Sequence, residues 1–212
     1  MAGSQRVYRQ RIRSTQALKK MFRAQELIAA SRIGKARDRM ARATPYARAI
    51  TRAVSALATH SDVSHPFLVE RRDTGRAAVL LVASDRGMAG AYSATVIRET
   101  EKLIARLTAE GKRVVLYVAG RRAETYYTFR QRPPERSWVG QSDAPTSELA
   151  DEIAGVLLDA YTAPAEAGGV DEPHGGYTQF VNMVSQRPRV IRLLPPEVVE
   201  GGVEPGQDEV LP

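Results

Sequence analysis

The sequence predicts an α/β protein in which a long, coiled-coil-type N-terminal helix precedes a small α/β domain. Strong helix formers (Ala, Arg, Lys, Leu, Met) dominate residues 1–60. Residues 61–194 instead alternate between short continuous apolar runs and segments of helical periodicity. The first 60 residues hold 14 Lys and Arg against two acidic residues, and the rest holds 17 against 22. The basic surface is therefore local to the N-terminal helix.

A single amphipathic helix is predicted from about Val7 to Thr59. Its small and apolar residues recur at alternating spacings of four and three, which is a heptad seam. A helix this long is not stable alone in water, so the seam predicts a partner helix. Pro45 is expected to kink or divide the helix, because proline removes one backbone hydrogen bond. The seam positions are Ala29, Ile33, Ala36, Met40, Ala43, Ala47, Ile50, Val54 and Leu57.

The α/β domain opens with "AAVLLVAS" (77–84), an apolar run of strand length. The turn "SDRGMAGAYS" (84–93) follows, and Ser93 is a plausible N-cap for a helix over 93–109. "RVVLYVAG" (113–120) is expected to form a second buried strand. Strands of this continuous apolar type favour a parallel sheet covered by helices.

Beyond residue 120 the pattern predicts a short helix from Arg121, a loop around Trp138 and a helix that Thr146 caps. Two further strands are expected at 177–184 and 189–194. The tail 195–212 is rich in proline, glycine and acid, which is typical of a linker or a disordered segment. The predicted organisation is therefore a helix over 1–60, an α/β domain over 61–194 and this tail. None of these segments supplies the partner helix that the seam requires.

Composition excludes several functions. The chain has no cysteine, which excludes disulfides, thiolate zinc sites and a cysteine nucleophile. His60, His65 and His174 lack metal-ligand spacing, and each is expected on the surface or in a loop. No apolar run reaches the ~18 residues that a membrane span needs. The sequence therefore points to no metal, no cofactor and no membrane-inserted segment.

Some residues of the turn at 84–93 suggest a catalytic or phosphate-binding site. Gly87 and Gly90 would let a backbone approach phosphate, but neither standard glycine-rich motif is present. Ser84 and Asp85 suggest a nucleophile, yet no histidine accompanies them in a recognisable context. A tight, charged strand-to-helix turn is the better interpretation, and a small phosphate-binding enzyme is the least favoured hypothesis.

The basic helix has several interpretations: a solvated charged face, a nucleic-acid-binding surface, a membrane surface, or a rod inside a protein sleeve. Lysine and arginine favour phosphate binding. Aromatic residues for base stacking are few (Tyr8, Phe22 and Tyr46), and the apolar seam suits a partner helix better than a groove. The seam is also too alanine-rich for an interfacial membrane helix. A protein partner is therefore favoured, with nucleic-acid binding as the alternative.

Four segments in order resemble the gamma subunit of F-type ATP synthase. They are "RIRSTQALKKMFRAQELIAASRIGKARDRM", "TPYA", "SDRGMAGAYS" and "YVAGRRAETYY". The resemblance covers nearly all of residues 5–199 and is most specific at 19–31, 39–47 and 85–87. It implies an antiparallel coiled-coil shaft, made by the N-terminal helix and a long C-terminal helix, above a small Rossmann-like α/β foot domain.

The resemblance also implies a function. The shaft would rotate inside the ring of alpha and beta subunits and couple proton flow to ATP synthesis. The foot would lie against the epsilon subunit and the membrane c-ring, on the cytoplasmic face of a bacterial plasma membrane. The subunit would carry no catalytic residue and bind neither cofactor nor nucleic acid. Lys20, Arg23 and Gln25 match the face that meets acidic loops of the ring.

The same comparison matches Asp85, Arg86 and Gly87 to the Asp-Arg-Gly turn of the foot. Met21 and Phe22 stand where the family usually has Ile-Thr, which would bring a bulky ring to the part of the helix that faces the sleeve. "DEPHGGYTQF" (171–180) replaces an apolar strand, and its proline and glycines are expected to shorten or break that strand. The family's C-terminal helix does not occur in these 212 residues, which suggests a truncated copy.

Overall fold

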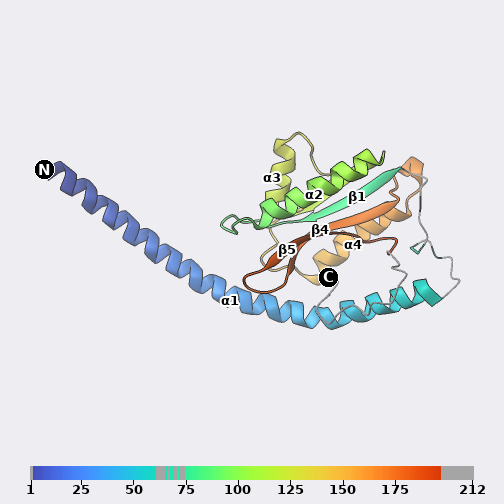
Figure 1. Cartoon of the computed structure of the whole chain (residues 1–212), viewed down its shortest axis with the longest axis horizontal. Coiled ribbons are helices and arrows are strands. Elements are labelled where there is room, and N and C mark those ends of the chain that lie inside the picture. The colour runs from blue at the N-terminus through green and yellow to red at the C-terminus, as the bar shows by residue number, and fades with distance from the viewer. Residues whose placement is uncertain (1, 61–64, 66, 69–70, 72–74, 197–212) are drawn as a thin grey trace. The chain divides into compact units, whose positions relative to one another are not determined.

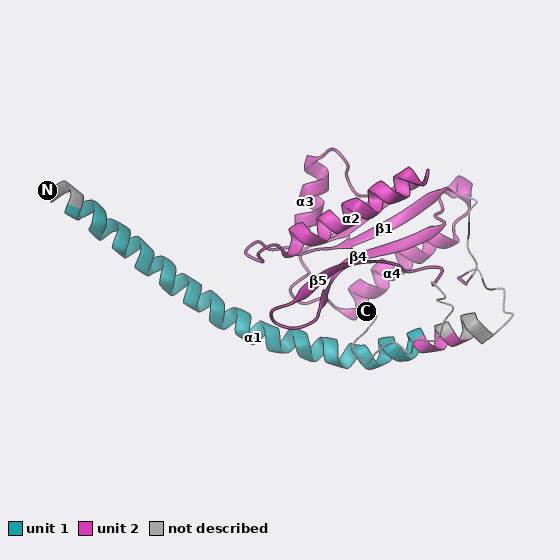
Figure 2. Ribbon diagram, viewed as in Figure 1, with its two compact units in different colours: residues 1–51, 207–212 teal, residues 52–206 magenta. Residues whose placement is uncertain are grey.

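A computed structural model describes residues 2–60, 65, 67–68, 71 and 75–196. The chain divides into two compact units, residues 1–51 with 207–212 and residues 52–206 (Figure 2). Most of the predicted tail, residues 197–212, lies outside the described residues. The boundaries predicted at residues 60 and 194 stay predictions.

The N-terminal segment is one α-helix, α1, Ala2–His60, with Pro45 inside it (Figure 1). At 1.5 Å per residue it is roughly 90 Å long. Proline does not divide it, so that part of the expectation was wrong. Good helix formers such as Ala43 and Ala47 lie on both sides of Pro45, and the loss of a single hydrogen bond does not end a helix of this length. Nearby, the Thr44 hydroxyl donates to the Met40 carbonyl at 2.7 Å.

The second unit is built on one five-stranded sheet with strand order β3-β2-β1-β4-β5. The strands are β1 (Arg76–Val82), β2 (Arg113–Ala119), β3 (Arg136–Trp138), β4 (Glu172–Phe180) and β5 (Gln186–Arg192). The first four are mutually parallel, and β5 pairs antiparallel with β4. The predicted α/β class is confirmed. The predicted loop at Trp138 is wrong, because that residue ends the short strand β3.

Helices cover both faces of the sheet (Figure 1). Helices α2 (Tyr92–Ala109) and α3 (Arg121–Phe129) pack on one face, and α4 (Ser147–Thr162) packs on the other. Successive residues of β1 point to opposite faces, so Val79 joins the α2 side and Ala78 the α4 side. This two-sided burial explains why the sequences of β1 and β2 read as continuous apolar runs.

Strand β4 overturns a sequence expectation. Pro173, Gly175 and Gly176 do not break it, and it runs unbroken as Glu172–Phe180. Pro173 is the second residue of the strand, where proline is better tolerated than in its middle. A Cβ atom on Gly176 would lie only 2.5 Å from the hydroxyl oxygen of Thr100, so the missing side chain lets α2 pack closely on the strand. Close packing therefore offsets the conformational cost of the glycine.

Candidate interaction surfaces

The turn between β1 and α2 is closed by its own serines. The Ser84 hydroxyl donates to the Arg86 carbonyl at 2.9 Å and lies 2.8 Å from the Ser93 hydroxyl. The Ser84 backbone N–H donates to the Ser93 hydroxyl at 3.3 Å. Ser93 is therefore not the predicted N-cap; helix α2 begins at Tyr92, and Ala91 holds the cap position without a side-chain hydrogen bond. Both hydroxyls are used to shape the turn.

Asp85 ties this turn to two other segments. Its Oδ1 accepts a hydrogen bond from Arg121 N at 2.9 Å, and its Oδ2 accepts one from Ser142 N at 2.8 Å. Its own backbone N–H donates to the Ser142 hydroxyl at 2.8 Å. Burial opposes ionisation, but the backbone donors of Gly140, Ser142 and Arg121 outweigh it and lower the pKa of Asp85 to about 2. The carboxylate is a charged structural tie.

The other two residues of the predicted foot turn have different environments. Arg86 is largely exposed, and its Nε lies 2.8 Å from an Asp143 carboxylate oxygen. Gly87 lies against the Arg122 guanidinium, so closely that a Cβ atom there would overlap Nη2. The structure thus brings Asp85, Arg86 and Gly87 together in one turn at the carboxyl end of β1.

A pocket of about 590 Å³ opens beside this turn, between the first turns of α2 and α3. Within the described part of the chain, Arg98 and Arg122 form no ion pair. Ile97 supplies an apolar part of the lining, and Glu101 brings the one acidic side chain among the lining residues. The lining therefore combines basic and apolar side chains. Its lining residues are Ser84, Arg86, Gly87, Met88, Ala89, Gly90, Ser93, Ala94, Ile97, Arg98, Glu101, Arg122 and Tyr126.

Helix α1 carries the second surface. Lys20, Arg23 and Gln25 are all exposed on it. Consecutive residues of an α-helix are about 100° apart, so Lys20 and Arg23 lie about 60° apart while Gln25 lies about 140° from Lys20. The helix therefore brings the two cations together and places Gln25 on another side. Arg23 also pairs with Glu26 at 2.8 Å, and both side chains are exposed.

The apolar seam of α1 carries exposed side chains. Ile33, Met40 and Ile50 are 37–48% exposed. Phe22, 52% exposed, lies in line with this seam by the same helical geometry. Its ring therefore adds bulk to the seam side of the helix, whereas Lys20 points to the opposite side.

The histidines depart in part from expectation. His65 is exposed, as predicted, and the side chain of His60 lies outside the described residues. The prediction for His174 was wrong: it is 4% exposed, in β4. In the part of the chain that the structure describes, no three acidic or histidine side chains gather as a metal site. Among the described helices, none combines the length and apolar character of a membrane span.

Fold and surfaces together define an α/β protein with a long basic helix and a charged turn at the carboxyl ends of its strands. The family model described as ATP synthase matches residues 4–211. The chain is 60% identical to the ATP synthase gamma chain of Beutenbergia cavernae over 212 residues, covering all of this chain and 71% of that one. It therefore belongs to the family of ATP synthase gamma chains.

A further gamma chain and two solved structures also match this chain. The gamma chain of Micrococcus luteus is 52% identical over 212 residues, with 71% of its length covered. Among solved structures, the Euglena gracilis mitochondrial ATP synthase rotor matches at TM-score 0.44 and 15% identity, covering 71% of this chain and 52% of that one. The central stalk and c-ring of Tetrahymena thermophila mitochondrial ATP synthase match at TM-score 0.44 and 16% identity, covering 72% of this chain and 70% of that one.

Proposed function

We propose that this chain is a central-stalk rotor subunit of a proton-translocating ATP synthase and transmits torque between a membrane c-ring and a catalytic ring of alpha and beta subunits. Membership of the gamma-chain family is the observation that carries the proposal. In this role the chain has no catalytic residue of its own. It works peripherally at the cytoplasmic face of a bacterial plasma membrane.

The physics of α1 supports the shaft role. A helix of 59 residues with an exposed apolar seam needs a partner helix, and a long antiparallel partner would give a stiff rod. Lys20 and Arg23 project from this rod toward any acidic sleeve around it. Exposed ion pairs are typically worth under ~1 kcal/mol, so such contacts attract a sleeve without locking a rotating shaft.

The α/β unit supports the foot role. The turn at Asp85, Arg86 and Gly87 is rigidly tied to its neighbours, and the pocket beside it presents Arg98 and Arg122 for a carboxylate-bearing partner. We propose the alpha, beta and epsilon subunits and the c-ring as the partners of the whole chain. The basic charge of α1 is the observation behind the nucleic-acid alternative, and family membership favours the rotor over it.

The test is reconstitution with the alpha and beta subunits of the same synthase. Two forms are compared: the 212-residue chain, and this chain extended by the residues that follow the matched region in the Beutenbergia cavernae gamma chain. The extended form is expected to co-purify in a stoichiometric complex and to support rotation-coupled ATP hydrolysis. Absence of any complex with the extended form would overturn the proposal. Duplex DNA binding with a steep salt dependence, in the absence of partner proteins, would favour the alternative.

A further inference from the structure

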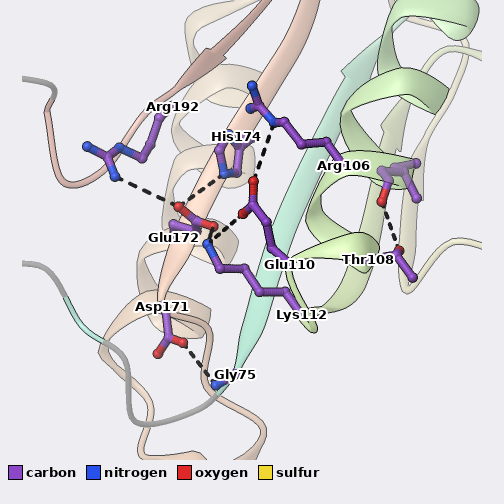
Figure 3. A network of polar contacts seen from close by, with 10 residues as sticks. Gly75, Arg106, Thr108, Glu110, Lys112, Asp171, Glu172, His174 and Arg192 are labelled. Atoms are coloured by element: carbon purple, nitrogen blue, oxygen red, sulfur yellow. Dashed lines mark hydrogen bonds and ion pairs between the residues drawn. The ribbon is translucent and has the colours of Figure 1, made fainter.

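A cluster of charged residues lies at the end of the sheet where β4 begins (Figure 3). Its centre is Glu172, at the start of β4. One carboxylate oxygen, Oε1, accepts a hydrogen bond from Nζ of Lys112, the residue just before β2. The other, Oε2, lies 3.4 Å from His174 Nε2 and 3.9 Å from Arg192 Nη1 at the end of β5. One carboxylate on β4 therefore links the residue before β2 to the end of β5.

The centre of this cluster is withdrawn from water. Glu172 is 7% exposed and His174 is 4% exposed. A buried carboxylate is tolerated only where cations and hydrogen bonds replace its hydration. Lys112 and Arg192 supply them here. Burial opposes ionisation of Glu172, but the hydrogen bond and the positive charge of Lys112 hold its pKa below the ordinary value.

His174 is the least well satisfied member. At 3.4 Å its Nε2 is beyond good hydrogen-bonding distance from Glu172, and it finds no other partner among the described residues. Burial lowers the pKa of this imidazole, Glu172 raises it, and Arg106 and Lys112 lower it again, for a net lowering. The neutral ring is therefore the form that this site accommodates.

The other charged groups around the His174 ring already form ion pairs or hydrogen bonds. From α2, Arg106 Nε lies 3.8 Å from Glu110 Oε1, and Glu110 Oε2 lies 3.3 Å from Lys112 Nζ. Asp171, next to Glu172, accepts a hydrogen bond from Gly75 N at 2.9 Å. A proton on His174 would add a positive charge beside Lys112 and Arg106. It would also compete with Lys112 and Arg192 for the single carboxylate of Glu172.

We propose that Glu172 and His174 form an acid-sensitive clasp, which joins the starts of β2 and β4 to the end of β5 while the imidazole is neutral and loosens when it takes up a proton. The protonated ring gains hydration only if the clasp opens. The device belongs to the α/β unit and does not rest on the proposed rotor function.

The sign of the pH effect follows from linkage. The folded chain holds His174 at a pKa below its ordinary 6.5. In acid the unfolded chain then binds more protons, so the stabilisation is complete above pH 6.5 and falls as the pH drops below it. Glu172, also lowered, adds a second loss below its ordinary 4.5. Both groups therefore make the fold weaker in acid.

The decisive experiment is an NMR titration of the histidine rings in the full chain. The His174 ring is expected to titrate with a midpoint below 6.5, and Glu172→Gln should lower that midpoint further because it removes the nearby negative charge. Over the same range, the backbone N–H of Leu193, which donates to Pro173, should lose at least tenfold of its hydrogen-exchange protection after correction for the intrinsic rate. A midpoint at or above 6.5, or unchanged protection, would overturn the clasp.

Thermal unfolding of variants gives a second readout. His174→Gln keeps a polar atom near the Nε2 position but does not titrate. The wild-type midpoint temperature should fall by up to about 3 °C between pH 6.5 and 5.5, and His174→Gln should lose most of this shift. His65→Gln, at an exposed position, is the matched control and should keep the shift. Equal shifts in all three proteins would contradict the proposal, and the ring titration decides the matter if His174→Gln does not fold.

Discussion

The carboxylate of Asp85 caps helix α3, because its Oδ1 accepts a hydrogen bond from Arg121 N at 2.9 Å. Arg121 is the first residue of that helix, where a negative charge meets the positive end of the helix dipole. The second carboxylate oxygen binds Ser142 N. One side chain therefore fixes the relative positions of the turn after β1, the start of α3 and the loop before α4.

Replacing Asp85 by Asn should destabilise the fold by about 1–3 kcal/mol. One carboxylate oxygen becomes an NH₂ donor, so either Arg121 N or Ser142 N loses its acceptor. The free energy of unfolding, from urea denaturation at pH 7, measures the loss. Asp151→Asn, at an exposed position of α4, makes the same change in charge and should cost under ~0.5 kcal/mol. Equal losses of unfolding free energy in the two variants would show that the Asp85 hydrogen bonds do not stabilise the fold.

The stabilisation by Asp85 should also depend on pH. Its pKa is lowered from 3.8 to about 2, so the ionised carboxylate stabilises the fold fully above pH 4. That contribution is lost as the pH falls toward 2. The difference in unfolding free energy between wild type and Asp85→Asn should therefore be constant from pH 7 to 5 and narrow by pH 3. A difference in unfolding free energy that stays constant down to pH 3 would contradict the lowered pKa of Asp85.

Gly120 should not tolerate a side chain. Its φ is +114°, and a Cβ atom there would overlap the carbonyl oxygen of Ala83. Both the conformation and the contact penalise alanine, so Gly120→Ala should cost more than about 2 kcal/mol. Gly155→Ala is the control: no atom lies within 4 Å of the added Cβ, and it should stabilise α4 by about 0.5–1 kcal/mol. Thermal unfolding should move in opposite directions for the two variants.

Thr146 caps α4 as the sequence predicts, since its hydroxyl accepts a hydrogen bond from Leu149 N at 3.3 Å. Thr146→Ala should lower the unfolding free energy by about 1 kcal/mol, because one backbone donor loses its partner. Thr125→Ala, at an exposed position inside α3, is the control and should be neutral or slightly stabilising. A cost shared by both variants would assign the effect to threonine itself and not to the cap.

The sequence predicted the elements whose burial pattern is local. Strands β1 and β2 were recognised as continuous apolar runs, and the cap at Thr146 was recognised because capping depends on residues three apart. The long helix followed from its seam. These signals lie within one element, so a single sequence carries them.

The features that were missed depend on contacts between distant segments. Nothing near Gly176 in the sequence reveals that Thr100 packs against it. The glycines of β4 alone therefore predict a broken strand. His174 is buried because it lies beside Glu172 on a covered strand, and Ser142 is 57 residues away from the Asp85 that it binds. Glu172 and His174 are two residues apart, so they share one face of a strand. This spacing was the available sequence signal for the buried pair.

The charges of α1 give the last prediction, which concerns the proposed ring contact. In the extended chain, Lys20→Glu together with Arg23→Glu should weaken binding to the alpha–beta ring about 5- to 30-fold at low salt. This corresponds to roughly 1–2 kcal/mol for two exposed pairs and their replacement by repulsion.

The salt dependence identifies the cause. Screening shortens the reach of exposed charges to about 8 Å at 0.15 M salt and about 3 Å at 1 M, so the deficit should shrink toward zero as salt is raised. Arg113→Glu with Arg187→Glu, both exposed in the α/β unit, makes the same change in net charge and should leave ring affinity within about twofold. Binding measured by titration calorimetry across salt concentrations checks both. If the control pair weakens binding equally, then net charge, and not the face of α1 that carries Lys20 and Arg23, governs the association.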